Sequence, residues 1–258
     1  MDINSIKSQF PIFSNKINGK PLVYLDSSNS SQKPLSVLKS LDNFYKNEFS
    51  NIGRSIHSLA VNATNRFEET RTNVKNFINA NSKDEIIFTK NATEAINLVA
   101  NTFGKENIQK GDEILITELE HHSNYVPWHY LRETKGAIIK FAPINDDGDI
   151  IIEKLKELLT PKTKIIAVTH LSNVTGTIVP IKEIVEIARK KNIPVIVDGC
   201  QSAPHIKIDV KDLDCDFFAF SAHKVYGPTG VGILYAKKKW LEKLPPYIGG
   251  GGMISEVK

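Results

Sequence analysis

The chain has 258 residues, of which 41% are hydrophobic and 24% charged, and 33 basic against 29 acidic side chains give a formal net charge of +4. This is the composition of an ordinary globular protein with one large or two small domains, and it excludes disordered, collagen-like and disulfide-rich chains. Because basic and acidic residues are interspersed along the chain, we expect no nucleic-acid partner and no membrane-binding surface.

The N-terminus lacks the basic segment and apolar run of a secretory signal, and no apolar stretch approaches the ~20 residues that span a bilayer. Two cysteines, Cys200 and Cys215, are too few for a disulfide framework, which favours a reducing compartment. We therefore expect a cytoplasmic protein.

The first 80 residues differ in pattern from the rest of the chain. Residues 34–45 and 61–80 have helical periodicity, and a polar loop separates them. This pattern predicts an N-terminal lobe or arm.

From residue 85 onward, short β-rich runs alternate with helical segments. The predicted strands are residues 85–89, 113–117, 137–141, 164–169, 194–198, 217–221 and 231–236, and the predicted helices are 93–103, 124–133, 152–159 and 181–190. This alternation predicts an α/β fold with a mainly parallel sheet flanked by helices. The gap between the last two runs is too short for a parallel crossover, so the final strand is expected to be antiparallel or placed elsewhere in the sheet.

Polar residues close five of these runs. The clusters are Asn91-Ala-Thr-Glu94, Glu120-His-His-Ser-Asn124, His170-Leu-Ser-Asn173, Asp198-Gly-Cys-Gln201 and Ser221-Ala-His-Lys224. Ligands of open α/β sheets bind outside the carboxyl ends of the strands. We therefore expect the five clusters to converge on one rim and to form a binding site.

Several common chemistries are excluded because their motifs are absent: the phosphate loop, the dinucleotide glycine motif, the zinc-protease pattern and the hydrolase elbow. His121 and His122 are neighbours whose side chains would diverge, so no metal site is expected. What remains is a lysine, an aspartate, a histidine and small hydroxyl residues, which is the set that pyridoxal phosphate requires. Lys224 could bind the cofactor covalently, and Asp198 could keep its pyridine nitrogen protonated.

The motifs together closely resemble those of the class V aminotransferase-like pyridoxal phosphate enzymes, and within them the cysteine desulfurase and selenocysteine lyase group. The resemblance runs from Phe10 to Ile254. It rests on Tyr24-Leu-Asp26 with Ser31-Gln-Lys-Pro34, Asn91-Ala-Thr-Glu94 with Asn97, Glu120-His-His-Ser-Asn124 with Val126-Pro-Trp128, His170-Leu-Ser-Asn173 with Gly176-Thr177, Asp198-Gly-x-Gln201, and Asp214-Cys-Asp-Phe217 with Ser221-Ala-His-Lys-Val-Tyr-Gly-Pro-Thr-Gly230. In this order and spacing the motifs are highly specific.

The resemblance implies a role for each matching residue. Lys224 matches the catalytic lysine that holds the cofactor, and His121 matches the histidine that stacks on the ring and takes part in proton transfer. The remaining cofactor contacts implied are Asp198 at the pyridine nitrogen, Gln201 at the ring hydroxyl, Asn173 beside ring and substrate, and Ala92, Thr93, Ser221 and His223 at the phosphate.

The implied fold is the large domain of fold-type I pyridoxal phosphate transferases, with a mainly parallel seven-stranded sheet and one antiparallel strand. Residues 1–60 would form an N-terminal arm and helix, residues 61–258 the cofactor-binding large domain, and a C-terminal small domain would be absent. The implied reaction converts L-cysteine to L-alanine and leaves an enzyme persulfide, whose sulfur an acceptor protein collects for iron–sulfur cluster assembly. Members of this family are homodimers.

Some positions depart from the family pattern. The family's nucleophilic cysteine and carboxylate-binding arginine would lie beyond Lys258, and the run Gly249–Gly252 close to the end predicts a truncated chain that turns over poorly. Gly53-Arg54-Ser55 stands where many relatives have His-Arg-Gly, Ser28-Asn29 replaces Ala-Ala, and Cys200 replaces alanine. These departures leave open a selenocysteine lyase, another class V lyase or transaminase, and a non-catalytic cofactor-binding chain.

Each candidate residue also has a plainer explanation. Lys224 could be a surface lysine in a Gly/Pro turn, and His121 and Asp198 could cap the segments that follow them. Cys200 and Cys215 are expected to be inert, since free cysteines behave as small buried apolar residues. Trp128 is expected to be a packing anchor.

Overall fold

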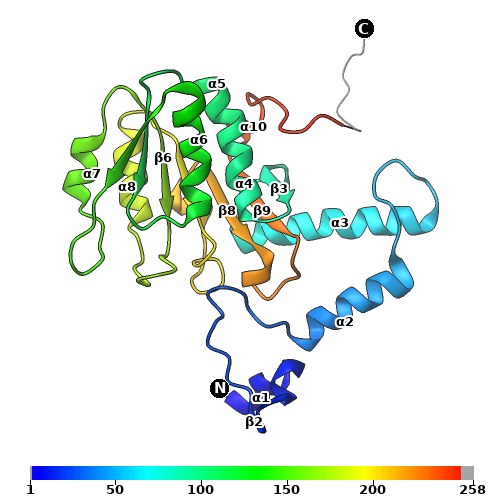
Figure 1. Ribbon diagram of the computed structural model, residues 1–258. Coiled ribbons are helices and arrows are strands. Elements are labelled where there is room, and N and C mark those ends of the chain that lie inside the picture. The colour runs from blue at the N-terminus through cyan, green and yellow to red at the C-terminus, as the bar shows by residue number, and fades with distance from the viewer. Residues whose placement is uncertain (1, 251–258) are drawn as a thin grey trace.

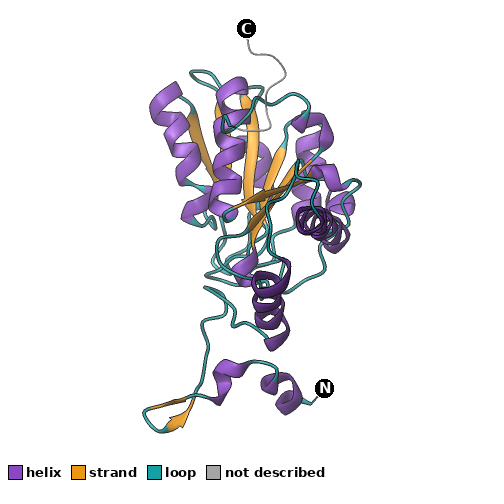
Figure 2. Cartoon of the chain, turned by 90° about the vertical axis from the view of Figure 1, so that its right-hand side faces the viewer, coloured by secondary structure: helices purple, strands orange, loops and turns teal. Residues whose placement is uncertain are grey.

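The computed structural model describes residues 2–250, so Gly251, Gly252 and the Met253-Ile254 pair of the resemblance lie outside the described residues. The molecule consists of a sheet with helices on both faces and an N-terminal segment that extends away from it (Figures 1 and 2).

Seven strands form the main sheet, in the order β3-β9-β8-β7-β6-β4-β5. Their bounds are β3 (Ile86–Thr89), β4 (Glu113–Thr117), β5 (Ile138–Ala142), β6 (Thr163–Thr169), β7 (Val195–Asp198), β8 (Phe217–Ser221) and β9 (Gly232–Ala236). β9 is antiparallel to both of its neighbours, β3 and β8, because a short loop carries the chain straight from β8 into it, and the other pairs in the sheet are parallel. The predicted α/β sheet with one antiparallel strand is confirmed.

Helices cover both faces of this sheet. They are α4 (Ala92–Val99), α5 (Lys105–Asn107), α6 (Val126–Lys135), α7 (Ile152–Leu158), α8 (Ile181–Arg189), α9 (Val210–Leu213) and α10 (Lys238–Leu241), and a π-helical turn, Ala100–Gly104, joins α4 to α5. Side chains alternate along a strand, so Ile114 and Ile116 of β4 share a core with α4 and α6, whereas Leu115 packs with α7 and α8 on the other face. Trp128 is fully buried, as expected of a packing anchor.

The N-terminal segment holds α1 (Ile3–Ser8), a two-stranded ribbon of β1 (Lys16–Ile17) and β2 (Lys20–Pro21), α2 (Leu35–Asn43) and α3 (Ser58–Phe77). The sequence predicted α2 and α3, although α3 starts earlier because the His57 ring caps the amide of Ala60 at 3.3 Å. It did not predict α1 or the ribbon, which bury no apolar face. The division of the chain at residue 60 falls inside α3 and stays a prediction.

No helix within residues 2–250 combines the length and the apolar character needed to cross a bilayer. Short 3₁₀ turns lie at the ends of strands, and two of them, His122–Asn124 after β4 and Ala222–Lys224 after β8, carry predicted site residues. Five strands present their following loops at one edge of the sheet, and this edge carries the pocket described below.

Candidate functional site

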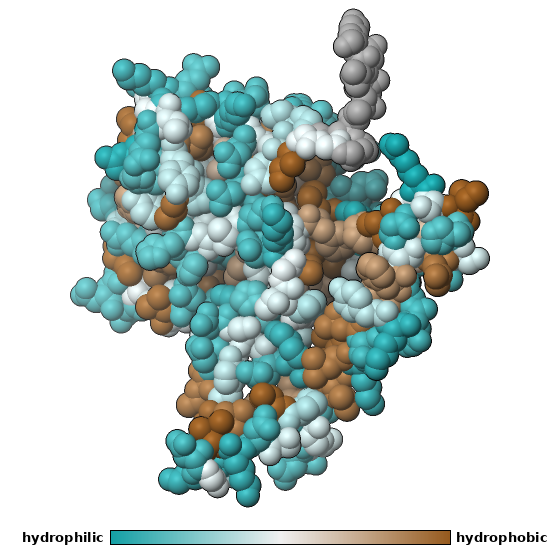
Figure 3. All heavy atoms as spheres, turned by 45° about the vertical axis from the view of Figure 1, so that its right-hand side comes forward, coloured by the Kyte–Doolittle hydropathy of each residue, from teal (hydrophilic) through white to brown (hydrophobic). Residues whose placement is uncertain are grey.

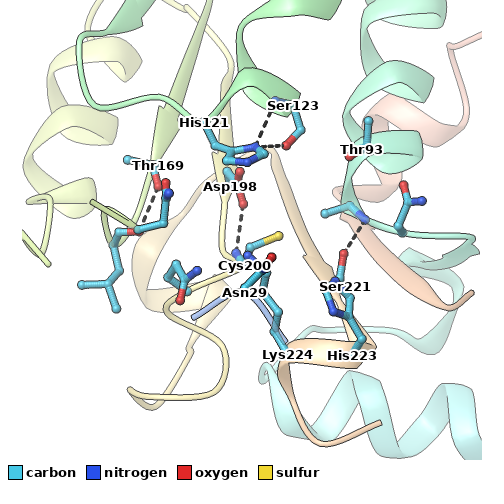
Figure 4. Close-up of a pocket in the computed structure, with 15 residues that line it drawn as sticks. Asn29, Thr93, His121, Ser123, Thr169, Asp198, Cys200, Ser221, His223 and Lys224 are labelled. Atoms are coloured by element: carbon cyan, nitrogen blue, oxygen red, sulfur yellow. Dashed lines mark hydrogen bonds between the residues drawn. The ribbon is translucent and has the colours of Figure 1, made fainter. Parts of the chain in front are cut away.

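A pocket of about 250 Å³ opens at the carboxyl ends of β3, β6, β7 and β8 and at the turn after β4 (Figure 4). All nine residues predicted from the sequence line it: Ala92, Thr93, His121, Asn173, Asp198, Gln201, Ser221, His223 and Lys224. The pocket also includes Asn29, Asn91, Ser123, Thr169, Leu171 and Cys200. The structure therefore brings every predicted site residue together, from segments more than 100 residues apart in the chain.

The N-terminus of α4 forms one wall. Asn91 caps this helix by accepting the amide of Glu94 at 2.8 Å, and the amide of Ala92 donates to Ser221 Oγ at 2.8 Å. A Cβ atom at Gly232 would lie 2.3 Å from the carbonyl carbon of Asn91, so only glycine lets β9 approach this closely. The first turn of a helix attracts anions through its free amides and its dipole, and the wall can therefore hold a phosphate group.

Asp198 ends β7 at the base of the pocket and is only 4% exposed. Its Oδ1 atom accepts the amide of Cys200 at 2.9 Å. Asp198 thus caps the next turn, as its plainer explanation proposed, and it also lines the pocket. The Cys200 thiol is a further donor beside this carboxylate. Because the carboxylate also borders the pocket, it can accept a proton donor from a ligand there.

His121 also combines a local role with a place in the pocket. Its Nδ1 atom accepts the amide of Ser123 at 3.1 Å and contacts the Ser123 hydroxyl, so the ring caps the turn that follows (Figure 4). Because Nδ1 is an acceptor in this assignment, the neutral ring carries its proton on Nε2.

Glu120 was not predicted as a site residue, although it stands in the motif that includes His121. Its carboxylate accepts Thr117 Oγ1 at 2.6 Å, the amide of Thr169 at 2.9 Å and Asn124 Nδ2 at 2.6 Å. It therefore ties the ends of β4 and β6 to the His121 turn. Burial, with a smaller effect of Asp198, raises the pKa of Glu120 to about 8 against these three hydrogen bonds.

Lys224 is half-buried and lines the pocket, so it is not a surface turn lysine. Its neighbour His223 contacts Ser30 Oγ through Nδ1 at 3.1 Å, and burial, with the nearby charges of Lys224 and Lys33, lowers the pKa of His223. Gln201 donates from Nε2 to the carbonyl of Ser28 at 2.6 Å. The N-terminal segment therefore reaches the pocket, as the family resemblance implied for the segment that holds Ser28-Asn29.

The departures from the family pattern divide into two groups. Asn29 and Cys200 line the pocket, whereas residues 53–55 do not. Burial and the neighbouring Asp198 raise the pKa of the Cys200 thiol well above its ordinary value, and burial raises that of Cys215 to about 12. Neither cysteine is therefore a thiolate at neutral pH, which agrees with the expectation that both are inert.

His170 lies behind the pocket and gives a pH-dependent prediction. It is 7% exposed, its Nδ1 atom finds no hydrogen-bond partner among residues 2–250, and burial lowers its pKa to about 4. Above pH 6.5 the ring is neutral in both states. As the pH falls toward 4 the unfolded chain binds a proton that the folded chain resists, so stability is lost. The free energy of unfolding should decrease between pH 7 and pH 4.5, and we expect this decrease to be about 2 kcal/mol smaller in His170→Phe than in wild type.

Urea unfolding at both pH values measures this effect. Other groups also titrate in this range, so the relevant quantity is the difference in pH dependence between wild type and variant. The exposed His205 supplies the matched control, since His205→Phe should leave the pH dependence unchanged. An identical pH dependence in wild type and His170→Phe would contradict the prediction.

Comparison with known proteins places this geometry in a family. A family model described as "Aminotransferase class-V" matches residues 23–258. A probable cysteine desulfurase of Halalkalibacterium halodurans is 50% identical over 257 residues, which cover 100% of this chain and 63% of that protein.

Two solved cysteine desulfurases have the same fold. The structure of CsdA from Escherichia coli superposes with a TM-score of 0.90 at 38% identity, over 100% of this chain and 63% of that one. The apo structure from Thermococcus onnurineus superposes with a TM-score of 0.93 at 34% identity, over 100% and 62% respectively. The chain thus spans less than two thirds of the length of these relatives. The two TM-scores confirm the expected fold-type I architecture. Because the family model matches residues 23–258, the chain belongs to the class V aminotransferase family.

Proposed function

We propose that this chain binds pyridoxal 5′-phosphate and forms the cofactor-binding part of a cysteine desulfurase, which converts L-cysteine to L-alanine and leaves an enzyme persulfide. The observation that carries the proposal is the convergence of Lys224, the buried Asp198 and the N-terminus of α4 on one pocket. The printed names of the relatives support the choice of reaction.

The donor set of the pocket fits this cofactor. The α4 amides, Thr93, Ser221 and His223 would hold its phosphate at the wall where β9 leaves room for the helix. Asp198 has a carboxylate oxygen available for the pyridine N–H, and Gln201 lies within the same pocket for the ring hydroxyl. Lys224 would hold the cofactor covalently.

Pyridoxal phosphate, when bound, supplies an electron sink for the negative charge that develops on the substrate α-carbon. The Asp198 carboxylate would accept a hydrogen bond from the protonated ring nitrogen and so stabilise it. Lys224, once free, moves a proton to or from the substrate carbons through Nζ. His121 lines the same pocket, and the capping bond to Ser123 fixes the orientation of its ring. Asn173 would contact ring and substrate.

The proposal assigns the persulfide to neither Cys200 nor Cys215. A thiol attacks sulfur as its thiolate, and burial keeps both thiols protonated. The chemistry proposed for this chain is therefore that of the cofactor site, and neither of its two cysteines is proposed as the nucleophile.

The proposed context is a cytoplasmic homodimer whose sulfur passes to an acceptor protein for iron–sulfur cluster assembly. Apolar side chains gathered over α2, α3 and the loop between them support an association surface (Figure 3), among them Tyr45 at 69%, Phe49 at 60% and Ile56 at 95% exposure. Sedimentation equilibrium measures the association directly.

One experiment tests the proposed reaction. The purified protein, loaded with pyridoxal 5′-phosphate, is incubated with L-cysteine, L-selenocysteine or a panel of amino acids with an oxo-acid acceptor. Alanine formed from cysteine supports a desulfurase. An added thiol serves as sulfur acceptor and as the two-electron reductant that releases the sulfur as sulfide. Turnover of selenocysteine alone indicates a lyase, and keto-acid exchange a transaminase. A loaded protein that turns over none of these substrates is a non-catalytic cofactor-binding chain.

A further inference from the structure

The segment Ser28–Lys33, here called the clasp, lies across the turn that carries Lys224. Four donors from the clasp converge on one atom, the carbonyl oxygen of His223. The three shorter contacts are the amide of Ser31 at 3.0 Å, the hydroxyl of Ser31 at 2.9 Å and the ammonium of Lys33 at 2.8 Å, and the hydroxyl of Ser30 lies at 3.4 Å. This carbonyl belongs to the peptide unit whose nitrogen is that of Lys224. The plane of that peptide is therefore set by residues 190 positions away in the chain.

The turn does not hold this peptide by itself. Its internal hydrogen bonds, from the amides of Val225 and Gly227, both end on the carbonyl of Ala222 at 2.9 Å, so they leave the His223 carbonyl to the clasp. Tyr226 adopts the left-handed conformation, with φ of +62°, which is unfavourable outside glycine. Its amide donates to Ser31 Oγ at 2.9 Å, so the clasp also stabilises this strained residue.

Lys33 is an unusual donor for such a contact. It is half-buried, its hydrogen bonds within the described chain go to the carbonyls of Ser31 at 2.6 Å and His223 at 2.8 Å, and no carboxylate of residues 2–250 forms an ion pair with it. Burial correspondingly lowers the pKa of Lys33. A partly desolvated ammonium without a counter-charge is unfavourable, but a charged donor holds a carbonyl more tightly than a neutral one.

We propose that Lys33 is a positioning residue for Lys224: with Ser31 it holds the His223 carbonyl and thereby fixes the backbone from which the Lys224 side chain enters the pocket. The part of this inference that concerns the cofactor rests on the proposed function. The part that concerns the backbone does not, and the two are tested separately.

Hydrogen–deuterium exchange of cofactor-free protein tests the backbone. The variant Lys33→Met keeps the length of the side chain and removes its charge, and Lys39→Met, at an exposed position of α2, is the matched control. We expect the amides of residues 222–227 to exchange about tenfold faster in Lys33→Met, the effect of losing one charge-assisted hydrogen bond from a turn that opens locally. Lys39→Met should match wild type, and Lys33→Arg, which keeps a cationic donor, should restore much of the protection.

Capture of the cofactor tests the consequence for Lys224. Protein loaded with pyridoxal 5′-phosphate is reduced with borohydride, and the yield and rate of the adduct on Lys224 are measured by peptide mass mapping beside the dissociation constant of the cofactor. We expect the rate at which the cofactor adduct forms on Lys224 to fall about tenfold in Lys33→Met. We also expect a shift in the pH midpoint of the pH dependence of that rate. The dissociation constant should change less, because the phosphate contacts are intact. A merely structural role would lower the melting temperature without moving that midpoint.

Each result decides one question. If residues 222–227 exchange equally in wild type and Lys33→Met, the inference is wrong, whether or not the cofactor binds. If exchange accelerates but a loaded protein captures the cofactor at Lys224 as wild type does, the clasp holds the turn without positioning Lys224, and the inference is also wrong. If wild-type protein takes up no cofactor, the proposed function fails, and the exchange measurement alone decides the role of Lys33.

Discussion

Replacing Lys224 with alanine is expected to abolish the borohydride-stable pyridoxyl adduct of the protein and, in assays that supply a thiol as sulfur acceptor, to lower alanine release from L-cysteine at least about 10³-fold. A positioned general acid–base side chain contributes about 10²–10⁴-fold to a rate, and the variant also loses the covalent attachment of the cofactor. Lys224 reaches the pocket from a turn held by the clasp, and it is the lysine among the fifteen lining residues. No other lysine in this pocket can replace it.

The variant should remain folded, which makes the result interpretable. Lys224 forms no hydrogen bond or ion pair within residues 2–250 through Nζ, so its truncation should change the free energy of unfolding by less than about 0.5 kcal/mol. The cofactor should still bind reversibly through α4, Ser221 and Asp198, with a visible absorption spectrum unlike that of wild type. Lys39→Ala is the control. A stable adduct on another lysine of the Lys224→Ala protein would overturn the assignment.

The sheet could be predicted from the sequence because its strands are buried on both faces. Nearly continuous apolar runs such as residues 164–169 and 194–198 show this burial directly, and the short gap before β9 indicates a reversal of direction. The carboxyl-end rule then places the polar clusters at one edge. Knowledge of the family motifs supplied the individual roles, since spacing alone does not distinguish Asp198 as a ligand from Asp198 as a cap.

The sequence gives no comparable signal for the contacts between distant segments. The clasp meets the Lys224 turn through hydrogen bonds of Ser31 and Lys33, and no periodic pattern around these two residues points to a partner 190 positions away in the chain. Glu120 was missed for a related reason: its donors come from Thr117, Asn124 and Thr169, and only the packing of β4 beside β6 brings the third to it. Local patterns predict elements and their ends, whereas the residues that join those ends depend on strand order.

Replacing Gly232 with alanine is expected to lower the free energy of unfolding by about 3 kcal/mol and to weaken pyridoxal phosphate binding at least about tenfold. The added Cβ would lie 2.3 to 2.7 Å from three backbone atoms of Asn91. Backbone atoms cannot rotate away as a side-chain end can, so either β9 or the start of α4 must shift. The helix start would move more readily, because β9 is paired on both sides with β3 and β8.

This shift would affect the site through one defined contact. The amide of Ala92 donates to Ser221 Oγ at 2.8 Å, and a displaced helix start would break this bond and turn the first amides of α4 away from the phosphate position. Urea unfolding and a cofactor titration measure the two effects, and Gly249→Ala, whose added Cβ meets nothing within 4 Å, is the matched control. The two effects should appear together in Gly232→Ala. A destabilised variant with wild-type affinity would show that the cofactor does not depend on the α4 wall, and the phosphate would then have to be held elsewhere in the pocket.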